Sequence, residues 1–248
     1  MTELALIRAA FSAAAESYDQ AARVQRRIIA QLAGLTPHSC RGLLLDAGSG
    51  TGQAASVLRS HHPEARLLPL DAAIGMCHRT GGICGDIEAL PLSDGSVALY
   101  WSSLAWQWTD ASRALQEAAR VLAPGGLLQV ATLGPDTLWE LRQAFRGIDG
   151  HTHVRNFTLA DELQQAATAA GFIDIQVKCE TECTHTPDLA GLLRELRAIG
   201  AHSLDAPRRR GLLSRSAWLA FQAAYEPHRE SAGLRASYDV IYLLARRP

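Results

Sequence analysis

The chain has 248 residues, of which 48% are hydrophobic and 20% charged, and its formal net charge is −1. This composition indicates a globular protein with a sizeable core. The near-zero charge argues against a general nucleic-acid binder. Because no run of about 18 apolar residues occurs, we predict no transmembrane helix and no membrane partner.

Residues 3–34 carry apolar side chains at helical spacing, with a break near residues 17–19 that divides two helices. The first 27 residues lack the basic start and apolar centre of a secretory signal. The five cysteines are odd in number and form no C-x-x-C pair. Both observations favour a cytoplasmic protein with reduced thiols and no metal site.

Alternating strand and helix patterns follow along the chain. Strands are predicted at residues 43–46, 66–71, 82–86, 97–102, 127–133, 172–183 and 237–245. Helices are predicted at residues 53–59, 111–122, 135–146, 158–170 (capped by Thr158), 189–201 and 214–225. This alternation predicts an α/β fold with a doubly wound, mostly parallel, Rossmann-like sheet of seven strands.

No repeat or low-complexity linker divides the chain, so we expect residues 1–248 to form a single domain. Within it, residues 1–36 are expected to form a helical lid and residues 40–135 the ligand-binding core. Residues 184–232 are expected to form a helical cap inserted before the last strand. In such sheets ligands bind beyond the carboxyl ends of the strands.

A glycine-rich turn follows the first predicted strand. Residues 43–52 read Leu-Leu-Leu-Asp-Ala-Gly-Ser-Gly-Thr-Gly, with glycines at alternate positions Gly48, Gly50 and Gly52. Glycine loses the most backbone freedom on folding. Three of them are expected where the chain turns tightly and a ligand approaches the backbone closely.

Two ligands compete for this turn. The pattern G-x-G-x-x-A at residues 50–55, followed by Asp71, fits a dinucleotide. Three acids favour S-adenosylmethionine instead. Asp46 would repel a pyrophosphate but suits an ammonium group, and Asp71 can accept hydrogen bonds from both ribose hydroxyls. Asp86 can accept from the adenine amino group while Ile87 packs on the ring; the alternative that these acids only cap turns stays open.

The motifs of this core form a family pattern. They are Asp46-x-Gly48-x-Gly50-x-Gly52, Asp71, Gly85-Asp86 and Arg120-Val121-Leu122-x-Pro124-Gly125-Gly126. Together they resemble the class I S-adenosylmethionine-dependent methyltransferases, which release S-adenosyl-L-homocysteine. The resemblance implies these cofactor-binding residues: Tyr18, Asp46, Gly48, Gly50, Gly52, Asp71, Ala72, Met76, Asp86, Ile87 and Ser102.

Further motifs lie outside this core. They are Phe11-Ser12, Ser17-Tyr18-Asp19, Gln25, and residues 102–108, 132–138, 145–151, 192–194, 199–201 and 238–242. Their order and spacing resemble the malonyl-[acyl-carrier-protein] O-methyltransferases of biotin synthesis. The resemblance implies methylation of the free carboxylate of a malonyl thioester, on acyl carrier protein or coenzyme A, giving the methyl ester that primes pimeloyl synthesis for biotin. Two alternatives stay open: a carboxyl methyltransferase for a free small acid such as trans-aconitate, and a non-enzymatic methyltransferase-like assembly factor.

A carboxylate substrate sets its own requirements. It is ionised at neutral pH and needs no general base, but a cation or a set of donors must hold it. The substrate-positioning candidates are Tyr18, Trp108, Arg146, His151, Arg155 and Arg194. Because Lys178 is the only lysine of the chain, arginine is its general basic residue, and a solvated surface role stays open for each candidate arginine.

The arginines of the predicted cap also bear on the partner. Arg194, Arg197, Arg208, Arg209, Arg210 and Arg215 lie in one stretch with only two acids, Glu195 and Asp205. Acyl carrier proteins are acidic, and such an excess of positive charge would steer an acidic partner. A solvated, arginine-rich surface is the alternative.

Overall fold

The computed structural model describes residues 3–16, 18–36, 39–148, 151–198 and 213–248. Its centre is one sheet with the strand order β3-β2-β1-β4-β5-β8-β6. The strands are β1 (Gly42–Ala47), β2 (Ala65–Asp71), β3 (Ile83–Cys84), β4 (Val97–Ser103), β5 (Leu122–Leu133), β6 (Ile173–Thr186), β7 (Arg229–Glu230) and β8 (Gly233–Arg246).

The strand directions confirm the predicted doubly wound, mostly parallel, Rossmann-like sheet. Strands β1 to β5 pair in parallel, and β8 runs antiparallel to both of its neighbours, β5 and β6. The seven predicted strands make up this path. The two-residue strand β7, which pairs only with β8, was not predicted because two exposed polar residues carry no strand pattern.

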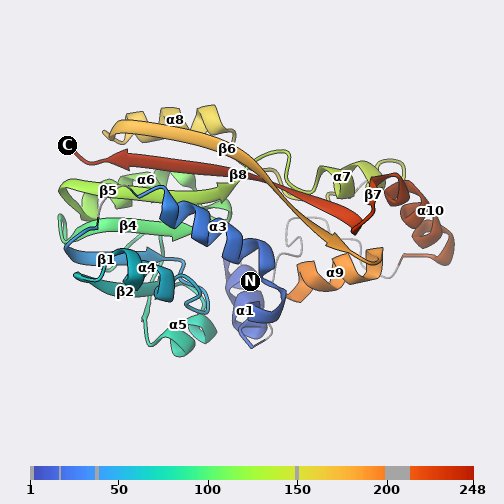
Figure 1. The fold of residues 1–248 in the computed structure, drawn as a ribbon, viewed down its shortest axis with the longest axis horizontal. Coiled ribbons are helices and arrows are strands. Elements are labelled where there is room, and N and C mark those ends of the chain that lie inside the picture. Colours follow the sequence, from blue (N-terminus) through green and yellow to red (C-terminus); the bar gives the residue numbers. More distant parts are fainter. Residues whose placement is uncertain (1–2, 17, 37–38, 149–150, 199–212) are drawn as a thin grey trace.

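Helices cover both faces of the sheet (Figure 1). They are α1 (Glu3–Ala14), α2 (Tyr18–Ala21), α3 (Arg23–Gly34), α4 (Ala55–His61), α5 (Ile74–Thr80), α6 (Ala111–Val121), α7 (Trp139–Phe145), α8 (Ala160–Ala169), α9 (Leu189–Ala198) and α10 (Arg215–Tyr225), with 3-10 turns η1 (Trp106–Trp108) and η2 (Glu226–His228). Neighbouring strand residues alternate between the two layers. Leu44 and Trp101 pack in the core beneath α3 and α4, whereas Leu45 and Tyr100 pack beneath α6 and α8.

Strands β6 and β8 form a long two-stranded ribbon that leaves the sheet and reaches α7, α9 and α10 (Figure 1). The fully buried Glu140 on α7 anchors this end, since its carboxylate accepts from the Ser237 hydroxyl at 2.5 Å and the Ser237 N–H at 3.2 Å. The Tyr225 hydroxyl donates to the Arg235 carbonyl at 2.8 Å. Helix α7 was expected outside the cap, but it packs against α10.

Some helix limits differ from the prediction. The helix expected from residue 158 begins at Ala160, and Thr158 is not its cap. Instead the Glu162 carboxylate accepts from the Leu159 N–H at 3.1 Å, so a side chain inside the first turn satisfies the helix end. The helix expected at 135–146 is limited to Trp139–Phe145. No helix of the described residues is long and apolar enough to cross a membrane.

Arg120 joins α6 to the segment between β3 and β4. Its guanidinium donates to the Glu117 carboxylate at 2.7 and 2.8 Å, to the Asp94 carboxylate at 2.7 Å, and to the carbonyls of Leu90 and Leu92 at 2.9 and 2.8 Å. All of its N–H directions therefore have an acceptor. Lysine cannot reproduce this fork, because it offers one compact charge.

We expect Arg120→Lys to lower the free energy of unfolding by about 1.5–3 kcal/mol, the usual contribution of hydrogen bonds to a charged group. Arg113→Lys on the same helix is the matched control, since the exposed Arg113 only approaches Glu88 at 3.7 Å. Urea unfolding followed by circular dichroism measures both. Equal losses of stability in the two variants would contradict the role given to Arg120.

Candidate active site

A pocket opens at the carboxyl ends of β1, β2 and β4 and is covered by α1 and α2. Eight of the predicted cofactor residues line it: Tyr18, Gly48, Gly50, Asp71, Ala72, Met76, Asp86 and Ile87. The carboxyl ends of parallel strands are the binding edge of this sheet type. The structure thus brings together residues from four separate parts of the chain.

The glycine turn lies flat against the end of β2. The N–H groups of Gly48 and Ser49 donate to the Leu70 carbonyl at 2.8 and 2.9 Å. Gly48 has φ +79°, and a Cβ there would lie 2.3 Å from the Ala105 Cβ. Only glycine satisfies both conditions, so this position is fixed by backbone conformation and by space. Gly52, with φ +85°, lies behind the pocket wall, where a Cβ would be 3.1 Å from a Thr80 methyl group.

Asp71 holds the turn and the start of α5 together. Its Oδ2 accepts from the Gly50 N–H at 2.9 Å, and its Oδ1 accepts from the Ala73 N–H at 2.8 Å. Burial raises the pKa of Asp71, and these backbone N–H groups act in the opposite direction. The carboxylate is therefore fixed in the pocket wall with lone pairs left for a ligand.

Asp46 lies beneath the turn and is only 2% exposed. Its Oδ2 has no hydrogen-bond partner within the described part of the chain, and the same holds for the neighbouring Ser49 hydroxyl. The pKa of Asp46 is raised to about 7, mainly by burial and to a smaller extent by the charge of Asp71. A buried carboxylate without a partner is costly, and a bound cation would satisfy it.

Asp86 faces α1 across the pocket. Its Oδ1 accepts from the Glu88 N–H at 3.0 Å, and its Oδ2 forms an ion pair with Arg8 at 2.5 Å. Helix α1 approaches closely because Gly75 has no side chain: a Cβ there would lie 2.8 Å from the Ser12 carbonyl oxygen. The sequence prediction missed Arg8, since one arginine on an amphipathic helix carries no distinguishing signal.

Helix α2 fastens the other side of the glycine turn. Asp19 accepts from the Thr51 hydroxyl at 2.5 Å and from the Gln53 amide at 2.8 Å. Beside it, Tyr18 lines the pocket, and burial together with Asp71 and Asp19 raises its pKa. Asp19 was also missed as a site residue, although it belongs to the motif Ser17-Tyr18-Asp19.

Three of the six substrate-positioning candidates gather at the pocket. Tyr18 and Trp108 line it, and the Arg155 guanidinium lies over the Trp108 ring at 4.9 Å. The Phe11 ring meets Trp108 edge-on at 5.4 Å and closes this wall.

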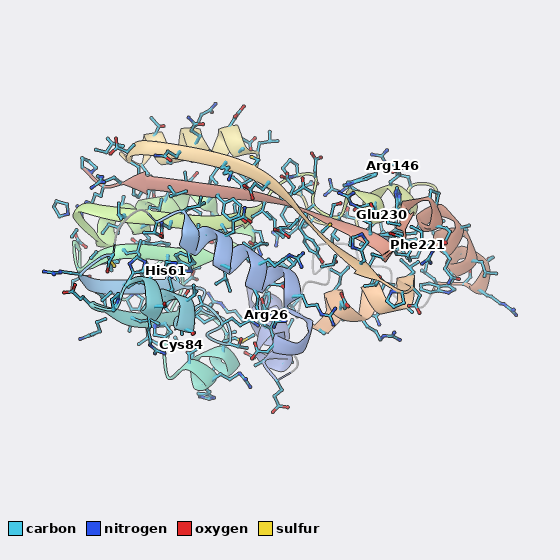
Figure 2. The ribbon with its side chains drawn as sticks, viewed as in Figure 1. Arg26, His61, Cys84, Arg146, Phe221 and Glu230 are labelled. Carbon is cyan, nitrogen blue, oxygen red and sulfur yellow. The ribbon has the colours of Figure 1, made fainter. Side chains whose placement is uncertain are left out.

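The other three candidates lie away from the pocket wall. Arg194 is exposed on α9, and His151 is half-buried. Arg146 is exposed next to Phe145, whose ring stacks on Phe221 of α10 at 4.0 Å. Figure 2 shows Arg146 at that end of the ribbon, far from Cys84 near the pocket.

Ser102, one of the predicted cofactor residues, does not line the pocket. It is fully buried, and its hydroxyl donates to the Ala47 carbonyl at 2.7 Å. Because strand residues alternate in direction, the neighbouring Ser103 lines the pocket instead. Leu104, with φ +56°, follows it in the wall and turns the chain toward η1.

The arginine-rich stretch of the cap is described in part. Arg194, Arg197 and Arg215 are exposed. Arg208, Arg209 and Arg210 lie outside the described residues. Among the residues that are described, no three histidine, cysteine or acidic side chains are grouped so as to hold a metal ion.

Solved structures with low sequence identity share this fold. Geranyl diphosphate C-methyltransferase from Streptomyces coelicolor A3(2), in complex with Mg²⁺, geranyl diphosphate and S-adenosyl-L-homocysteine, is 16% identical, with a TM-score of 0.53 over 88% of this chain and 79% of that chain. Phospholethanolamine N-methyltransferase 2 from Haemonchus contortus, in complex with phosphomonomethylethanolamine and S-adenosylhomocysteine, is 16% identical, with a TM-score of 0.55 over 96% of this chain and 57% of that chain. These similarities show the fold of the chain.

Sequence comparisons are more specific. A family model described as a methyltransferase domain matches residues 45–130. The malonyl-[acyl-carrier protein] O-methyltransferase of Dechloromonas aromatica is 47% identical over 98% of this chain and 94% of its own length. That of Laribacter hongkongensis is 41% identical over 100% of this chain and 90% of its own. The biotin biosynthesis bifunctional protein BioHC of Cellvibrio japonicus is 38% identical over 96% of this chain and 49% of its own. The chain therefore belongs to the malonyl-[acyl-carrier protein] O-methyltransferase family.

Proposed function

We propose that this protein transfers a methyl group from S-adenosyl-L-methionine to the free carboxylate of a malonyl thioester, giving the methyl ester that primes pimeloyl synthesis for biotin. The observation that carries this proposal is the buried Asp46 beneath the glycine turn, whose Oδ2 has no partner in the described part of the chain, with Arg155 over Trp108 at the edge of the same site. Asp46 offers a negative charge to a cationic group of the ligand, and Arg155 offers a positive charge to an anionic group of the substrate. The names of the full-length relatives support the choice of acceptor.

S-adenosylmethionine supplies an activated methyl group on a sulfonium centre. The site fits this ligand: Asp46, beneath the glycine turn, would pair with its ammonium group, and Asp71 in the pocket wall would accept from its ribose hydroxyls. Asp86 would accept from the adenine amino group, with Ile87 and Met76 against the ring. Gly50, where an added Cβ would meet no atom within 4 Å, leaves the backbone bare toward the pocket.

The acceptor carboxylate needs positioning and a dry site, because it is already a nucleophile at neutral pH. We assign its binding to Arg155, whose planar guanidinium can hold a carboxylate by two hydrogen bonds. The Arg155 guanidinium lies 4.9 Å from the centre of the Trp108 ring, and the cation–π attraction helps to hold it there. An apolar wall that excludes water is formed by Phe11, Tyr18 and Trp108.

The remaining assignments follow from the arrangement of the helices. Residues 1–36 would act as the lid, since α1 and α2 cover the pocket, and residues 184–232 would receive the acyl carrier protein. The exposed Arg194, Arg197 and Arg215 favour an acidic partner there. The cytoplasmic location expected from the cysteine pattern stays a prediction.

The acceptor is tested directly by mass spectrometry. Malonyl-acyl carrier protein incubated with the protein and S-adenosylmethionine should gain one methyl group, and mild ester hydrolysis should remove it. Malonyl-coenzyme A is the second substrate, and free trans-aconitate is the control. Turnover of trans-aconitate alone would favour the small-acid alternative, and no turnover with no cofactor binding would favour a non-enzymatic factor.

Asp46→Asn should lower the affinity for S-adenosylmethionine by about tenfold to 100-fold, because a hydrogen bond between charged groups contributes about 1.5–3 kcal/mol. In the ligand-free protein the pKa of Asp46 is about 7. Affinity should therefore rise as the pH increases through this value, with proton release on binding below it. Calorimetry measures both, and the pH dependence should disappear in the variant.

Asp46→Asn should weaken ligand binding but raise the stability of the ligand-free protein. Asp46 ionises near pH 4 in the unfolded chain and near pH 7 in the folded protein, which therefore binds the extra proton. Its ionisation opposes folding as the pH rises through this window. The melting temperature of Asp46→Asn should exceed that of the wild type by more at pH 8 than at pH 5; an Asn variant that is less stable at pH 8 would contradict the assignment.

Arg155→Gln should raise the KM for the malonyl substrate by about tenfold, the loss of one charge-assisted interaction, and leave the affinity for S-adenosylhomocysteine nearly unchanged. Arg146→Gln is the matched control, because Arg146 is exposed at the far end of the ribbon. Steady-state kinetics with malonyl-acyl carrier protein separates the two. Equal KM values in both variants would remove Arg155 from the substrate site.

A further inference from the structure

Two cysteines lie in contact behind the pocket. The Sγ atoms of Cys77 on α5 and Cys84 at the end of β3 are 2.7 Å apart. Cys77 is buried, whereas Cys84 is exposed. Figure 2 labels Cys84 in the region of β3 and α5. All five cysteines are free thiols in this structure, and Cys77 and Cys84 are the pair whose sulfurs are in contact.

The pair touches the backbone of Asp71. The Cys77 thiol donates to the Asp71 carbonyl at 3.2 Å, and the Gly85 N–H donates to the same oxygen at 3.0 Å. Cys84 is the partner of Asp71 in the β2–β3 ladder. Two pocket residues are close neighbours in sequence: Met76 precedes Cys77, and Asp86 follows Cys84 by two positions. A change at the sulfurs therefore acts on the elements that carry the wall of the pocket.

The two thiols differ in reactivity. Burial, and then the neighbouring Cys84 sulfur, raises the pKa of Cys77 to about 12, so Cys77 stays protonated at neutral pH. Cys84 is open to solvent and meets a dissolved oxidant first. The accessible Cys84 is therefore the thiol that reacts with an oxidant, and the buried Cys77 is placed to resolve the product because its sulfur contacts that of Cys84.

We propose that Cys77 and Cys84 form a peroxide-sensitive thiol pair, which closes to a disulfide and weakens ligand binding in the adjoining pocket. The Cys84 sulfur attacks hydrogen peroxide, an S–O bond forms, the O–O bond breaks and one water leaves. The Cys77 sulfur then attacks the Cys84 sulfenic acid, an S–S bond forms, and the S–O bond breaks. The Cys77 proton leaves with the hydroxide as a second water, so two thiols lose two electrons and one peroxide is reduced.

Closure changes the contacts behind Asp71. The thiol proton that Cys77 donates to the Asp71 carbonyl is lost, and the sulfurs must come from 2.7 Å to bonding distance, about 2.05 Å. Helix α5 is thereby drawn toward β3, and Asp71 and Met76 move with their elements. A dithiol restores the starting state by exchange. The effect on ligand affinity rests on the proposed cofactor, whereas disulfide formation does not.

Peptide mapping tests the bond itself. Trypsin cleaves after Arg66, Arg79 and Arg113, so Cys77 and Cys84 fall in separate peptides, residues 67–79 and 80–113. After peroxide treatment and thiol blocking, the two peptides should be linked, with the loss of two hydrogens, and dithiothreitol should separate them. Cys84→Ser should form no link, and the exposed Cys179 serves as an internal control. Oxidation of Cys84 to sulfinic acid without a linked peptide would overturn the pair.

Calorimetry with S-adenosylhomocysteine tests the coupling to the pocket. Oxidised wild-type protein should bind it about fivefold more weakly or worse, the lower end of usual coupling between sites, and dithiothreitol should restore the affinity. Cys84→Ser treated in the same way should keep its affinity. A linked peptide with unchanged affinity would overturn the coupling. Failure of the reduced wild type to bind would contradict the proposed cofactor, while the disulfide is judged by the peptides alone.

Discussion

The active-site edge of this protein depends on the two backbone hydrogen bonds that Asp71 accepts. One comes from Gly50 in the glycine turn and the other from Ala73 at the start of α5. The end of β2 thus sets the position of both neighbouring segments. Without this carboxylate, a turn with three glycines would have many conformations open to it. The ligand surface is therefore built largely from backbone that one side chain holds in place.

A second acid beside Asp71 lowers the stability of the ligand-free protein. Asp46 lies buried close enough to Asp71 for the charge of Asp71 to contribute to its raised pKa. Two carboxylates without a cation between them oppose folding of the ligand-free protein. Such strain is common where a site is preformed for a charged ligand. The stability of the scaffold comes from elsewhere, from the two apolar layers beneath α3 and α4 and beneath α6 and α8.

The sequence was sufficient for the central sheet because its strands are buried apolar runs separated by helical periodicity. The residues of the pocket floor could be predicted equally well, because Gly48, Asp71 and Asp86 follow strands whose carboxyl ends meet at one edge of the sheet. The sequence did not reveal contacts between segments that are far apart along the chain. Arg8 reaches Asp86 only because α1 packs on Gly75, and nothing in the local pattern records this contact.

Side-chain direction is a further feature that could not be predicted from the sequence. One residue of register decides whether Ser102 or Ser103 faces the ligand, and a predicted strand boundary is too imprecise to settle it. Helix α8 gives a similar case: Glu162 inside the first turn does what was expected of Thr158. The three substrate candidates near the pocket were separated from Arg146, Arg194 and His151 only by tertiary structure.

The continuous pairing of β6 and β8 bears on which side of the pocket can open to a ligand. From Gln176 to Thr186 the two strands pair without a register shift, so the helices at its end are carried by a continuous ladder of hydrogen bonds. Helix α1 instead meets the body through side-chain contacts such as that of Arg8 with Asp86. Displacing α1 breaks side-chain contacts, whereas bending the ribbon breaks backbone hydrogen bonds of the sheet. The lid proposed for residues 1–36 therefore lies on the side of the pocket that is held by side chains, opposite the hydrogen-bonded ribbon.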